Sequence, residues 1–425
     1  MHTDSDPTTF LKQLFDSAVA SADPGHCLAG YLPEPTSNGR TLVVGAGKGS
    51  AAMAAAVEKV WTTELSGTVI TPYGHGCDTH TINIVEAAHP VPDQAGLEAA
   101  ARILEIAQTL GTGDQMLCLL SGGGSALLTL PAEGLSLQAK QDINRQLLQS
   151  GADITQINCV RKHLSGIKGG RLAVAAWPAT TVSLMISDVA GDDPTVIASG
   201  PTTADPTSCK DALEIIARYN VRIPAALNAS LVKGSNETPK PGAVELSRSS
   251  HRIVASAKGA LQAVYDEVAP LHFEVNNLGD EVIGESREVG REHGRLFRHL
   301  VTQGDPGQPL LLISGGETTV TIRGQGQGGP NREYLLALAI ELDGIPDVWA
   351  IACDTDGLDG THDAAGAVIG PSTLKRARDL GLNPARMLDD NDAGSFFATL
   401  ENAVVTGPTR TNINDLRILA YIPTA

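Results

Sequence analysis

The feature that most constrains this chain is a regular alternation of short apolar runs with amphipathic stretches of helical spacing. The runs include TLVVGAG, GTVITPYG, QMLCLLSGGG and TVSLMISDVAG, and later PLLLISGG and DVWAIACDTDG. This alternation predicts an α/β fold with two domains, in which helices cover mainly parallel sheets. Such sheets place their sites in loops at the carboxyl ends of strands, and nearly every run here ends in Gly, Ser, Asp or His.

The chain is long enough for two hydrophobic cores. It has 425 residues, of which 42% are hydrophobic, and domains of this kind rarely exceed about 250 residues around one core. The segment LVKGSNETPKPGAVE at 231–245 is polar and rich in turn formers. We therefore predict an N-terminal domain at 1–236 and a C-terminal domain at 244–425. SGGGSALL and SGGETTVTI echo each other, one in each domain, and suggest two half-sites facing a common cleft.

The charge balance excludes some classes of partner. With 31 Lys and Arg against 48 Asp and Glu, the net charge is −17, which repels nucleic acid and anionic membrane surfaces. An anionic substrate must then be bound by a local basic patch. The six cysteines lie far apart with no CxxC pair, so we expect reduced thiols.

The sequence carries no sign of export or membrane insertion. MHTDSDPTTF has neither a basic region nor an apolar core, and no stretch approaches the roughly 18 apolar residues of a membrane span. We expect a soluble, cytoplasmic protein. Pairing of edge strands into a homodimer is compatible with the sequence.

The run VVGAGKGSAA predicts a strand, a glycine turn and a helix, with Lys48 in the turn. A dinucleotide-binding turn needs a third glycine, where this chain has Ser50, and an acid after the next strand, which ends in Thr71 and Pro72. A P-loop needs Ser or Thr after its lysine, where Gly49 stands. What remains is a loop, including Gly45 and Gly47, that binds a phosphate or stabilises developing negative charge, or else an ordinary turn with a solvated lysine.

The run SGGGSALL predicts a second anion-binding loop, formed by Ser121, Gly122, Gly123, Gly124 and Ser125. Three consecutive glycines cost conformational entropy, and a nest of amides around an anion would explain them. The alternative is a tight turn with Ser125 as a helix N-cap. The SGGET run, which begins at Ser314, is a weaker signal of the same kind.

A basic cluster follows in ADITQINCVRKHLSGIKGGRLA. The apolar residues recur at helical spacing, and the polar part of this helix and turn collects Arg161, Lys162, His163, Lys168 and Arg171. On an acidic chain this predicts a site for a carboxylate or phosphate. The alternative is a solvated basic face that balances acidic neighbours.

Two clusters of aspartates follow predicted strands. SDVAGDD holds Asp188, Asp192 and Asp193, and a later cluster holds Asp354, Asp356, Asp359 and Asp363. Such carboxylates are the usual oxygen ligands of Mg²⁺ and the usual base for a hydroxyl nucleophile. The alternative is turn and cap chemistry. The spacing does not fit a calcium loop, the histidines and cysteines have no zinc spacing, and no GxSxG elbow is present.

These motifs together resemble the glycerate 2-kinase family, whose members are often labelled hydroxypyruvate reductase. The resemblance runs almost the whole length, through VVGAGKGSAA, AAHPVPD, LSGGGSALL, NCVRKHLSGIKGGRLA, SDVAGDDPTVIASGPT, ISGGETTV, GQGGPNREYLLALA, DTDGLDG and TGPTRTNINDLR. It implies a Rossmann-like N-terminal domain and a smaller C-terminal MOFRL domain, with the active site in the cleft between them. It also implies transfer of the γ-phosphoryl of ATP to the 2-hydroxyl of D-glycerate, giving 2-phospho-D-glycerate, with a divalent cation such as Mg²⁺.

The resemblance implies a role for each loop. It places Lys48 among the functional residues and supports active-site roles for both aspartate clusters. We hypothesise that Lys48 acts on the transferring phosphoryl, that Asp188 or Asp192 directs the hydroxyl proton, and that Asp188 and Asp193 hold the metal. We expect the basic cluster to bind the substrate carboxylate through Arg161, His163 and Lys168. The residues expected to bind the nucleotide or its phosphates are Gly45 and Gly47, the SGGGS loop, and Ser314, Gly315, Gly316, Glu317 and Asp356.

The chain departs from the family pattern at two points. Many relatives read GGRN where this chain has Pro330 before Asn331, and TGPTGTN where it has Arg410. We hypothesise that Arg410, or alternatively Arg323 or Arg332, supplies the missing cation. The departures leave open a longer aldonic acid such as erythronate or threonate. The rival activity is an NAD(P)H-dependent hydroxypyruvate reductase, and a sensor without catalysis is a third alternative.

Overall fold

The computed structural model describes residues 6–360 and 364–423, and the chain divides into two compact units. The first unit is Pro24–Val254, and the second unit combines Met1–Asp23 with Ala255–Ala425. The α/β class with two units is as the sequence predicts, but the division of the chain differs at both ends of the first unit.

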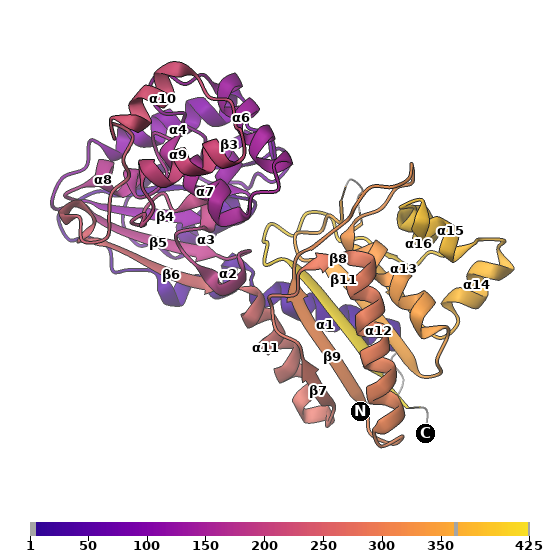
Figure 1. Cartoon of the computed structure of the whole chain (residues 1–425). Helices are drawn as coiled ribbons and strands as arrows, with labels where there is room; N and C mark the ends of the chain where they lie inside the picture. The colour runs from indigo at the N-terminus through magenta and orange to yellow at the C-terminus, as the bar shows by residue number, and fades with distance from the viewer. Residues whose placement is uncertain (1–5, 361–363, 424–425) are drawn as a thin grey trace. The chain divides into compact units, whose positions relative to one another are not determined.

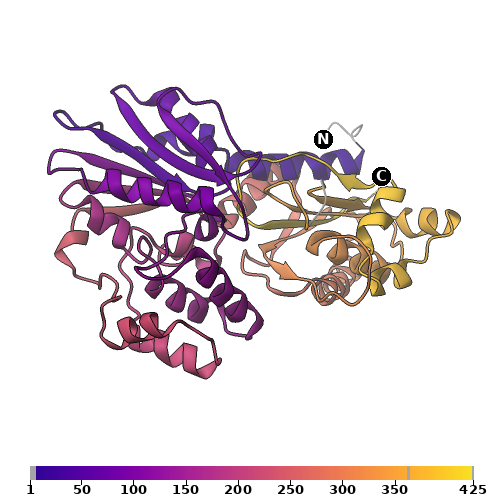
Figure 2. The same ribbon diagram turned by 90° about the horizontal axis from the view of Figure 1, so that it is seen from above.

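Helix α1 (Pro7–Ser21) belongs to the second unit, although it begins the chain. Its apolar face buries Leu11, Leu14, Phe15 and Ala18, and it packs against α11 (Ala257–Val268). Figures 1 and 2 both show the indigo α1 beside the orange and yellow elements of this unit. The predicted domain 1–236 therefore includes a helix whose burial depends on residues more than 200 positions later.

The predicted linker at 231–245 lies inside the first unit. After it the chain adds β6 (Ser249–Ala255) to the first sheet, next to β5 (Thr180–Ile186). The amide of Thr181 donates to the carbonyl of Arg248 at 2.9 Å. The polar, turn-rich composition of the segment reflects a surface loop that leads back to an edge strand, and the boundary falls at the last residues of that strand, after Val254.

The first sheet has the strand order β3-β2-β1-β4-β5-β6. The pairs β1–β2, β2–β3, β1–β4 and β4–β5 are parallel. This is the order of a Rossmann-type sheet, in which the direction of winding reverses between β1 and β4 and ligands bind at that reversal. The elements of the unit are α2 (Pro24–Cys27), η1 (Ala29–Tyr31), β1 (Thr41–Ala46), α3 (Ser50–Val60), β2 (Leu65–Pro72), β3 (Ile82–Ala87), α4 (Gln94–Ala107), β4 (Gln115–Leu120), α5 (Gly124–Leu127), α6 (Leu137–Gln149), α7 (Ile154–His163), α8 (Arg171–Ala176), β5, η2 (Ala190–Asp192), η3 (Ile197–Ser199), α9 (Cys209–Arg218), α10 (Ala225–Val232), η4 (Val244–Leu246) and β6.

The second sheet has the order β13-β12-β11-β14-β9-β7 and is mixed. Strand β14 lies between β9 and β11 and runs antiparallel to both, whereas β7 and β9 are parallel. The last strand returns through the centre of the sheet, which the alternation of runs does not reveal. The elements are α1, α11, η5 (Ala269–Leu271), β7 (Glu274–Asn277), β8 (Gly284–Glu285), α12 (Ser286–Gln303), β9 (Leu310–Gly316), β10 (Thr318–Thr319), α13 (Pro330–Leu342), β11 (Val348–Asp354), β12 (Gly366–Ile369), α14 (Thr373–Asp379), α15 (Pro384–Asp389), α16 (Ala393–Thr399), β13 (Ala403–Val404) and β14 (Asp415–Tyr421).

Each unit has its own core. In the first unit one apolar cluster lies against the sheet, and a second joins α6, α7, α9 and α10 around Leu147 and Val160. In the second unit α13 is buried almost all round, with Leu335 and Leu336 inaccessible to solvent. No helix within the described residues is long and apolar enough to span a bilayer.

Candidate active site

The loops that follow β1 and β4 meet at the reversal point of the first sheet. The amide of Lys48 donates to the carbonyl of Gly122 at 2.8 Å, and the amide of Gly49 donates to Ser121 Oγ at 2.9 Å. The amide of Gly47 donates to the carbonyl of Ile70 in β2 at 3.0 Å. The two predicted loops thus form one hydrogen-bonded structure, at the position where a Rossmann-type sheet binds its ligand.

The glycines before Lys48 are explained by close packing. A Cβ at Gly45 would lie 2.0 Å from the carbonyl oxygen of Leu119, and a Cβ at Gly47, whose φ is +146°, would lie 2.2 Å from Ser121 Oγ. The amides of Gly47, Lys48 and Gly49 are all engaged within the protein. This loop therefore offers a ligand the Lys48 side chain rather than a cradle of amides, and a phosphate role for Gly45 and Gly47 stays a prediction without separate support.

The SGGGS loop is more open toward a ligand. A Cβ at Gly123, whose φ is +79°, would lie 3.0 Å from the ring of His89 and 3.6 Å from Lys48 Cγ. The described residues supply no acceptor for the amides of Gly122 and Gly123. These two amides beside the half-buried Lys48 keep the predicted anion-binding role open for this loop.

The loop also contacts the SGPT segment. The hydroxyl oxygens of Ser125 and Ser199 lie 2.8 Å apart, and a Cβ at Gly124 would lie 2.8 Å from Ala198 Cβ. Ala198 and Ser199 have φ values of +51° and +61°, which L side chains rarely adopt. The carbonyl of Ala198 accepts a hydrogen bond from Lys168 Nζ at 3.2 Å. Lys168 thereby helps to hold a strained segment against the glycine loop.

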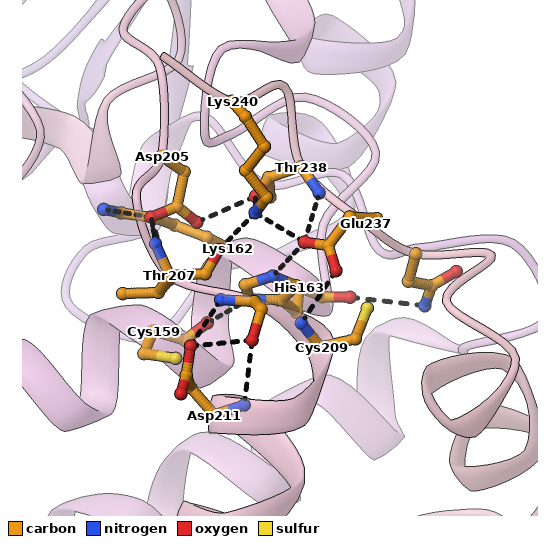
Figure 3. Close-up of polar contacts among 12 residues, drawn as sticks. Cys159, Lys162, His163, Asp205, Thr207, Cys209, Asp211, Glu237, Thr238 and Lys240 are labelled. Carbon is orange, nitrogen blue, oxygen red and sulfur yellow. Dashed lines mark hydrogen bonds and ion pairs between the residues drawn. The ribbon is translucent and has the colours of Figure 1, made fainter.

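The predicted basic cluster separates into two parts. We call Lys162, His163 and Arg171 the neutralised cluster, because the charge of an acidic side chain acts on each of them. Asp205 faces Lys162 and Glu237 faces His163 (Figure 3), and the charges of both acids act on Arg171. Lys162 Nζ lies 3.4 Å from the fully buried carboxylate of Asp205, and His163 Nε2 lies 3.2 Å from Glu237 Oε1.

His163 is consequently better explained as a structural residue than as a substrate ligand. Its ring is fully buried, with Nδ1 against the carbonyl of Cys159 at 2.8 Å and Nε2 against Glu237. Both ring nitrogens are therefore engaged inside the protein. Arg171 likewise donates to the carbonyl groups of Lys162, Lys168 and Asn236.

The same region holds a group of possible metal ligands. His163, Cys209 and Glu237 place their ligand atoms within 4.8 Å of one another, the one such group among the residues that the structure describes. Lys240 Nζ also lies 2.5 Å from Glu237 Oε1, and this ion pair is drawn in Figure 3. Burial and the Glu237 carboxylate raise the pKa of the Cys209 thiol to about 11. A protonated thiol and a competing ammonium disfavour a metal here.

None of the remaining basic residues forms an ion pair with an acid in the part of the chain that the structure describes. Arg161 is half-buried on α7, and its Nε donates to Asn144 Oδ1 at 3.3 Å. Lys168 is 1% exposed. They are joined by Lys140 on α6, which is 3% exposed and which sequence reasoning missed. The signal was present, because Lys140 shares the buried face of α6 with Ile143 and Leu147 at helical spacing. We call Lys140, Arg161 and Lys168 the cationic cluster.

The aspartates after β5 lie on a turn that includes η2. Asp188 is half-buried, and Asp192 adopts a φ of +54°. Asp193 Oδ1 accepts from the amide of Thr195 at 2.8 Å, which is the turn chemistry that the sequence left as an alternative. Their roles as base and metal ligands stay predictions.

In the second unit the SGGET loop is shaped by packing. The amide of Gly315 donates to the carbonyl of Gly279 at 2.9 Å, and a Cβ at Gly316, whose φ is +114°, would lie 2.3 Å from the carbonyl oxygen of Val282. Glu317 is exposed, and Ser314 Oγ is buried without a hydrogen-bond partner among the described residues. The glycines are accounted for without a phosphate, so the predicted phosphate role of this loop rests on the resemblance.

The aspartates of the second cluster make different contacts from one another. Asp356 is buried and accepts from the amide of Leu358 at 2.8 Å. Asp359 caps α13, accepting from the amides of Asn331 and Arg332 and from Arg332 Nε at 2.8 Å. Asp363 lies outside the described residues.

Arg332 is engaged in an ion pair with Asp359, so it is a poor substitute for the arginine that the family has before Asn331. The other two candidates, Arg410 and Arg323, are both exposed. Arg410 has a φ of +62°, a left-handed conformation that glycine adopts most easily. The amide of the preceding residue, Thr409, donates a hydrogen bond to the carbonyl of Asp356 at 3.1 Å. Arg410 is thus anchored beside the aspartate loop of its own unit.

Comparisons with known proteins agree with this architecture. Residues 10–232 match a domain of unknown function, DUF4147, and residues 310–415 match the MOFRL family. A relative from Agrobacterium vitis, provisionally named hydroxypyruvate reductase, is 48% identical over 413 residues, covering 96% of this chain and 93% of that protein. A D-glycerate 2-kinase from Thermotoga maritima is 37% identical over 424 residues, covering 97% of this chain and 99% of that protein. The crystal structure of a glycerate kinase from Thermotoga maritima matches with a TM-score of 0.89 and 35% identity, covering 98% of this chain and 99% of that one.

Proposed function

This chain belongs to the MOFRL-type glycerate kinase family, and from that premise we propose that it transfers the γ-phosphoryl group of ATP to the 2-hydroxyl of D-glycerate, giving 2-phospho-D-glycerate. The observation that carries the proposal is the position of Lys48. Its backbone is fixed to the SGGGS loop at the reversal point of the first sheet, and its side chain lies beside Gly123. A fixed cation at that point suits phosphoryl transfer, which depends mainly on positioning and on stabilising charge.

The aspartates after β5 supply the acid-base and metal chemistry in this proposal. Mg²⁺ is usually held by one or two carboxylates together with phosphate oxygens, and Asp188 and Asp193 are carboxylates on one short turn. They would hold the ion, which neutralises charge on the phosphates. Asp192 or Asp188 would accept the proton of the 2-hydroxyl as it attacks.

The acceptor is a small hydroxy acid, and its carboxylate needs a cation. Arg161 and Lys168 are the candidates in the first unit, and Arg410 is the candidate in the second. A longer acid such as erythronate or threonate stays an alternative acceptor, because Pro330 and Arg410 depart from the family pattern.

The name of the Agrobacterium vitis relative favours a second candidate, an NAD(P)H-dependent hydroxypyruvate reductase. The first sheet has the strand order that such an enzyme needs. However, β2 ends in Thr71 and Pro72, and the hydroxyl of Thr71 donates to the carbonyl of Gly47 at 3.2 Å. Without a carboxylate there to bind the adenosine ribose, the kinase is the better-supported activity.

The decisive experiment mixes the purified protein with D-glycerate, ATP and Mg²⁺, measures ADP release by a coupled assay, and identifies the product by phosphorus NMR. A parallel reaction contains hydroxypyruvate and NADH, and further reactions contain erythronate and threonate. Formation of 2-phosphoglycerate that depends on Mg²⁺, without NADH oxidation, is the expected result. NADH oxidation without ADP release would overturn the proposal.

The Lys48→Ala variant tests the role of the lysine. We expect kcat to fall by about three orders of magnitude, a loss typical of removing a charge that stabilises the transition state. Lys59→Ala is the matched control, because Lys59 is an exposed lysine at the end of the helix that follows Lys48. A Lys48→Ala enzyme that retained the kcat of the control would assign the lysine no catalytic role.

A further inference from the structure

Lys140 is a buried lysine whose ammonium has no partner among the described residues. It is 3% exposed and lies on the inner face of α6, in line with Ile143 and Leu147. Its Nζ makes no hydrogen bond with any other described residue. A lysine is almost never buried in this way unless something pairs with it, because desolvating an ammonium costs several kcal/mol.

The groups that surround Lys140 add positive charge. Arg161 acts on it from α7, and Lys168 lies in the turn beyond that helix. On α6 itself, the neighbouring Asp142 and Arg145 are exposed and pair with each other at 2.9 Å. No described carboxylate forms an ion pair with any member of the cationic cluster.

The pKa directions agree with this geometry. Burial and the charge of Arg161 lower the pKa of Lys140 to about 7. Burial, with the charges of Lys140 and Arg161, holds the pKa of Lys168 well below its usual value. Lys140 and Lys168 are thus close enough to Arg161 for its charge to lower the pKa of each, and no described carboxylate forms an ion pair with any of the three.

We propose that Lys140, Arg161 and Lys168 form a subsite for a small oxyanion, and that Lys140 is a further binding residue for the carboxylate of the hydroxy-acid substrate. This inference deepens the proposed function and rests on it for the identity of the anion. A carboxylate provides acceptors for several N–H donors at once and offsets the desolvation of the charges.

The position of the cluster connects it to the glycine loop. Lys168 Nζ donates to the carbonyl of Ala198, and Ala198 lies against Gly124. Ser199 Oγ contacts both Ser125 Oγ, at 2.8 Å, and Asn158 Oδ1, at 3.3 Å. An anion bound by the cluster is thus coupled, through one short segment, to the loop proposed to contact the phosphoryl group.

The test compares wild-type protein with Lys140→Met and Lys140→Arg. We expect Lys140→Met to raise the KM for D-glycerate about tenfold or more, with the KM for ATP changed less than about twofold, and Lys140→Arg to recover most of the affinity. Lys233→Met is the control, since Lys233 is an exposed lysine of the same unit. A rise in the KM for ATP instead would assign the oxyanion to a nucleotide phosphate and overturn the carboxylate assignment. Unchanged affinity for both substrates would overturn the subsite.

A second measurement uses wild-type protein alone, so it does not depend on the folding of a variant. Binding of D-glycerate, erythronate or inorganic phosphate is followed by calorimetry at about pH 8 in buffers of different ionisation enthalpy. A bound oxyanion restores the proton of Lys140 and favours the protonated form of Lys168 as well, so we expect uptake of about one to two protons per site for the anion that occupies the cluster. Absence of proton uptake for every anion that binds would contradict the proposal. A protein that binds D-glycerate with proton uptake but releases no ADP would overturn the kinase proposal and leave the subsite intact.

Discussion

The neutralised cluster and the cationic cluster arise from the same basic helix and turn, yet they face opposite surroundings. Lys162 and His163 on α7 meet the carboxylates of Asp205 and Glu237. Within the described residues, their neighbour Arg161, together with Lys168 and Lys140, meets neutral acceptors or other cations and forms no ion pair. A charge that the protein balances internally has a structural role, whereas a buried charge that it leaves unbalanced needs a partner from outside.

Neutralising the first cluster depends on residues far along the chain. Asp205 is 43 positions from Lys162, and Glu237 is 74 positions from His163. The sequence of the helix alone therefore cannot separate the two clusters. The contrast leads to four predictions, in which removing a charge has opposite effects in the two places.

The largest expected effect is on stability in the neutralised cluster. Asp205 is fully buried and accepts from Lys162 Nζ and from the hydroxyls of Thr207 and Thr238. Asp205→Ala leaves a buried ammonium without its carboxylate, so we expect the free energy of unfolding to fall by about 3–5 kcal/mol. Urea unfolding would measure this loss. Asp142→Ala is the control, because its exposed pair with Arg145 contributes about 0–1 kcal/mol. A loss as small as that of the control would mean that the cluster is not neutralised in the way described.

Removing a charge from the cationic cluster should have the opposite sign. Lys140→Met replaces a buried ammonium with an apolar side chain of similar length, so we expect the unliganded protein to gain about 1–4 kcal/mol. The folded-state pKa of Lys140 is lowered to about 7 from 10.5. The unfolded chain thus binds more protons between these values, and this group makes wild-type stability rise as pH increases from 7 to 10.5. Urea unfolding at several pH values should show a variant advantage that is full near pH 7 and shrinks toward pH 10.5. A destabilised Lys140→Met would indicate a structural partner for the amine.

Glu237 should show a pH dependence in a different window. Burial raises its pKa, but hydrogen bonds from Lys240, the amide of Cys209 and His163 outweigh that effect and lower it to about 2 from 4.5. The folded state therefore holds the carboxylate charged, and its contribution is present above pH 4.5 and is lost as pH falls toward 2. Because Glu237 is 38% exposed, we expect only about 1 kcal/mol between wild type and Glu237→Gln near neutral pH. Thermal unfolding from pH 6 to pH 3 should show this difference shrinking, and a constant difference would contradict the ion-pair description.

The sequence predicted where the site loops lie better than it predicted what their residues contact. A buried strand followed by glycines was enough to place Lys48 after β1 and the SGGGS loop after β4, because strand, turn and helix are local patterns. The glycines themselves are explained by contacts with Leu119 in β4 and with Ser121 in the loop that follows β4. That contact exists only after the sheet has formed.

The same limit applies to the division into units and to the second sheet. α1 buries one apolar face, but its partner α11 begins at residue 257. The run that becomes β14 has the composition of any buried strand, and its antiparallel place between β9 and β11 follows from the return of the chain. The composition of a run predicts that it forms a buried strand, but tertiary packing determines which strands lie beside it and in which direction it runs.

The smallest expected effect on stability is at Arg410. This residue is a further cation, in the second unit, that no described acid neutralises. No acid among the described residues pairs with Arg410, and its φ of +62° disfavours any L side chain. Arg410→Gly should therefore stabilise the protein by about 0.5–1 kcal/mol, measured by urea unfolding, because glycine adopts this conformation readily. If the arginine is retained to bind substrate, the same variant should lower kcat/KM for D-glycerate about tenfold through KM. Glu401→Gly separates the two effects, since Glu401 is exposed and also left-handed, with a φ of +56°. Equal stabilisation in both variants with a kinetic loss only in Arg410→Gly would assign Arg410 to the substrate, whereas unchanged kinetics would end the idea that it replaces the missing cation.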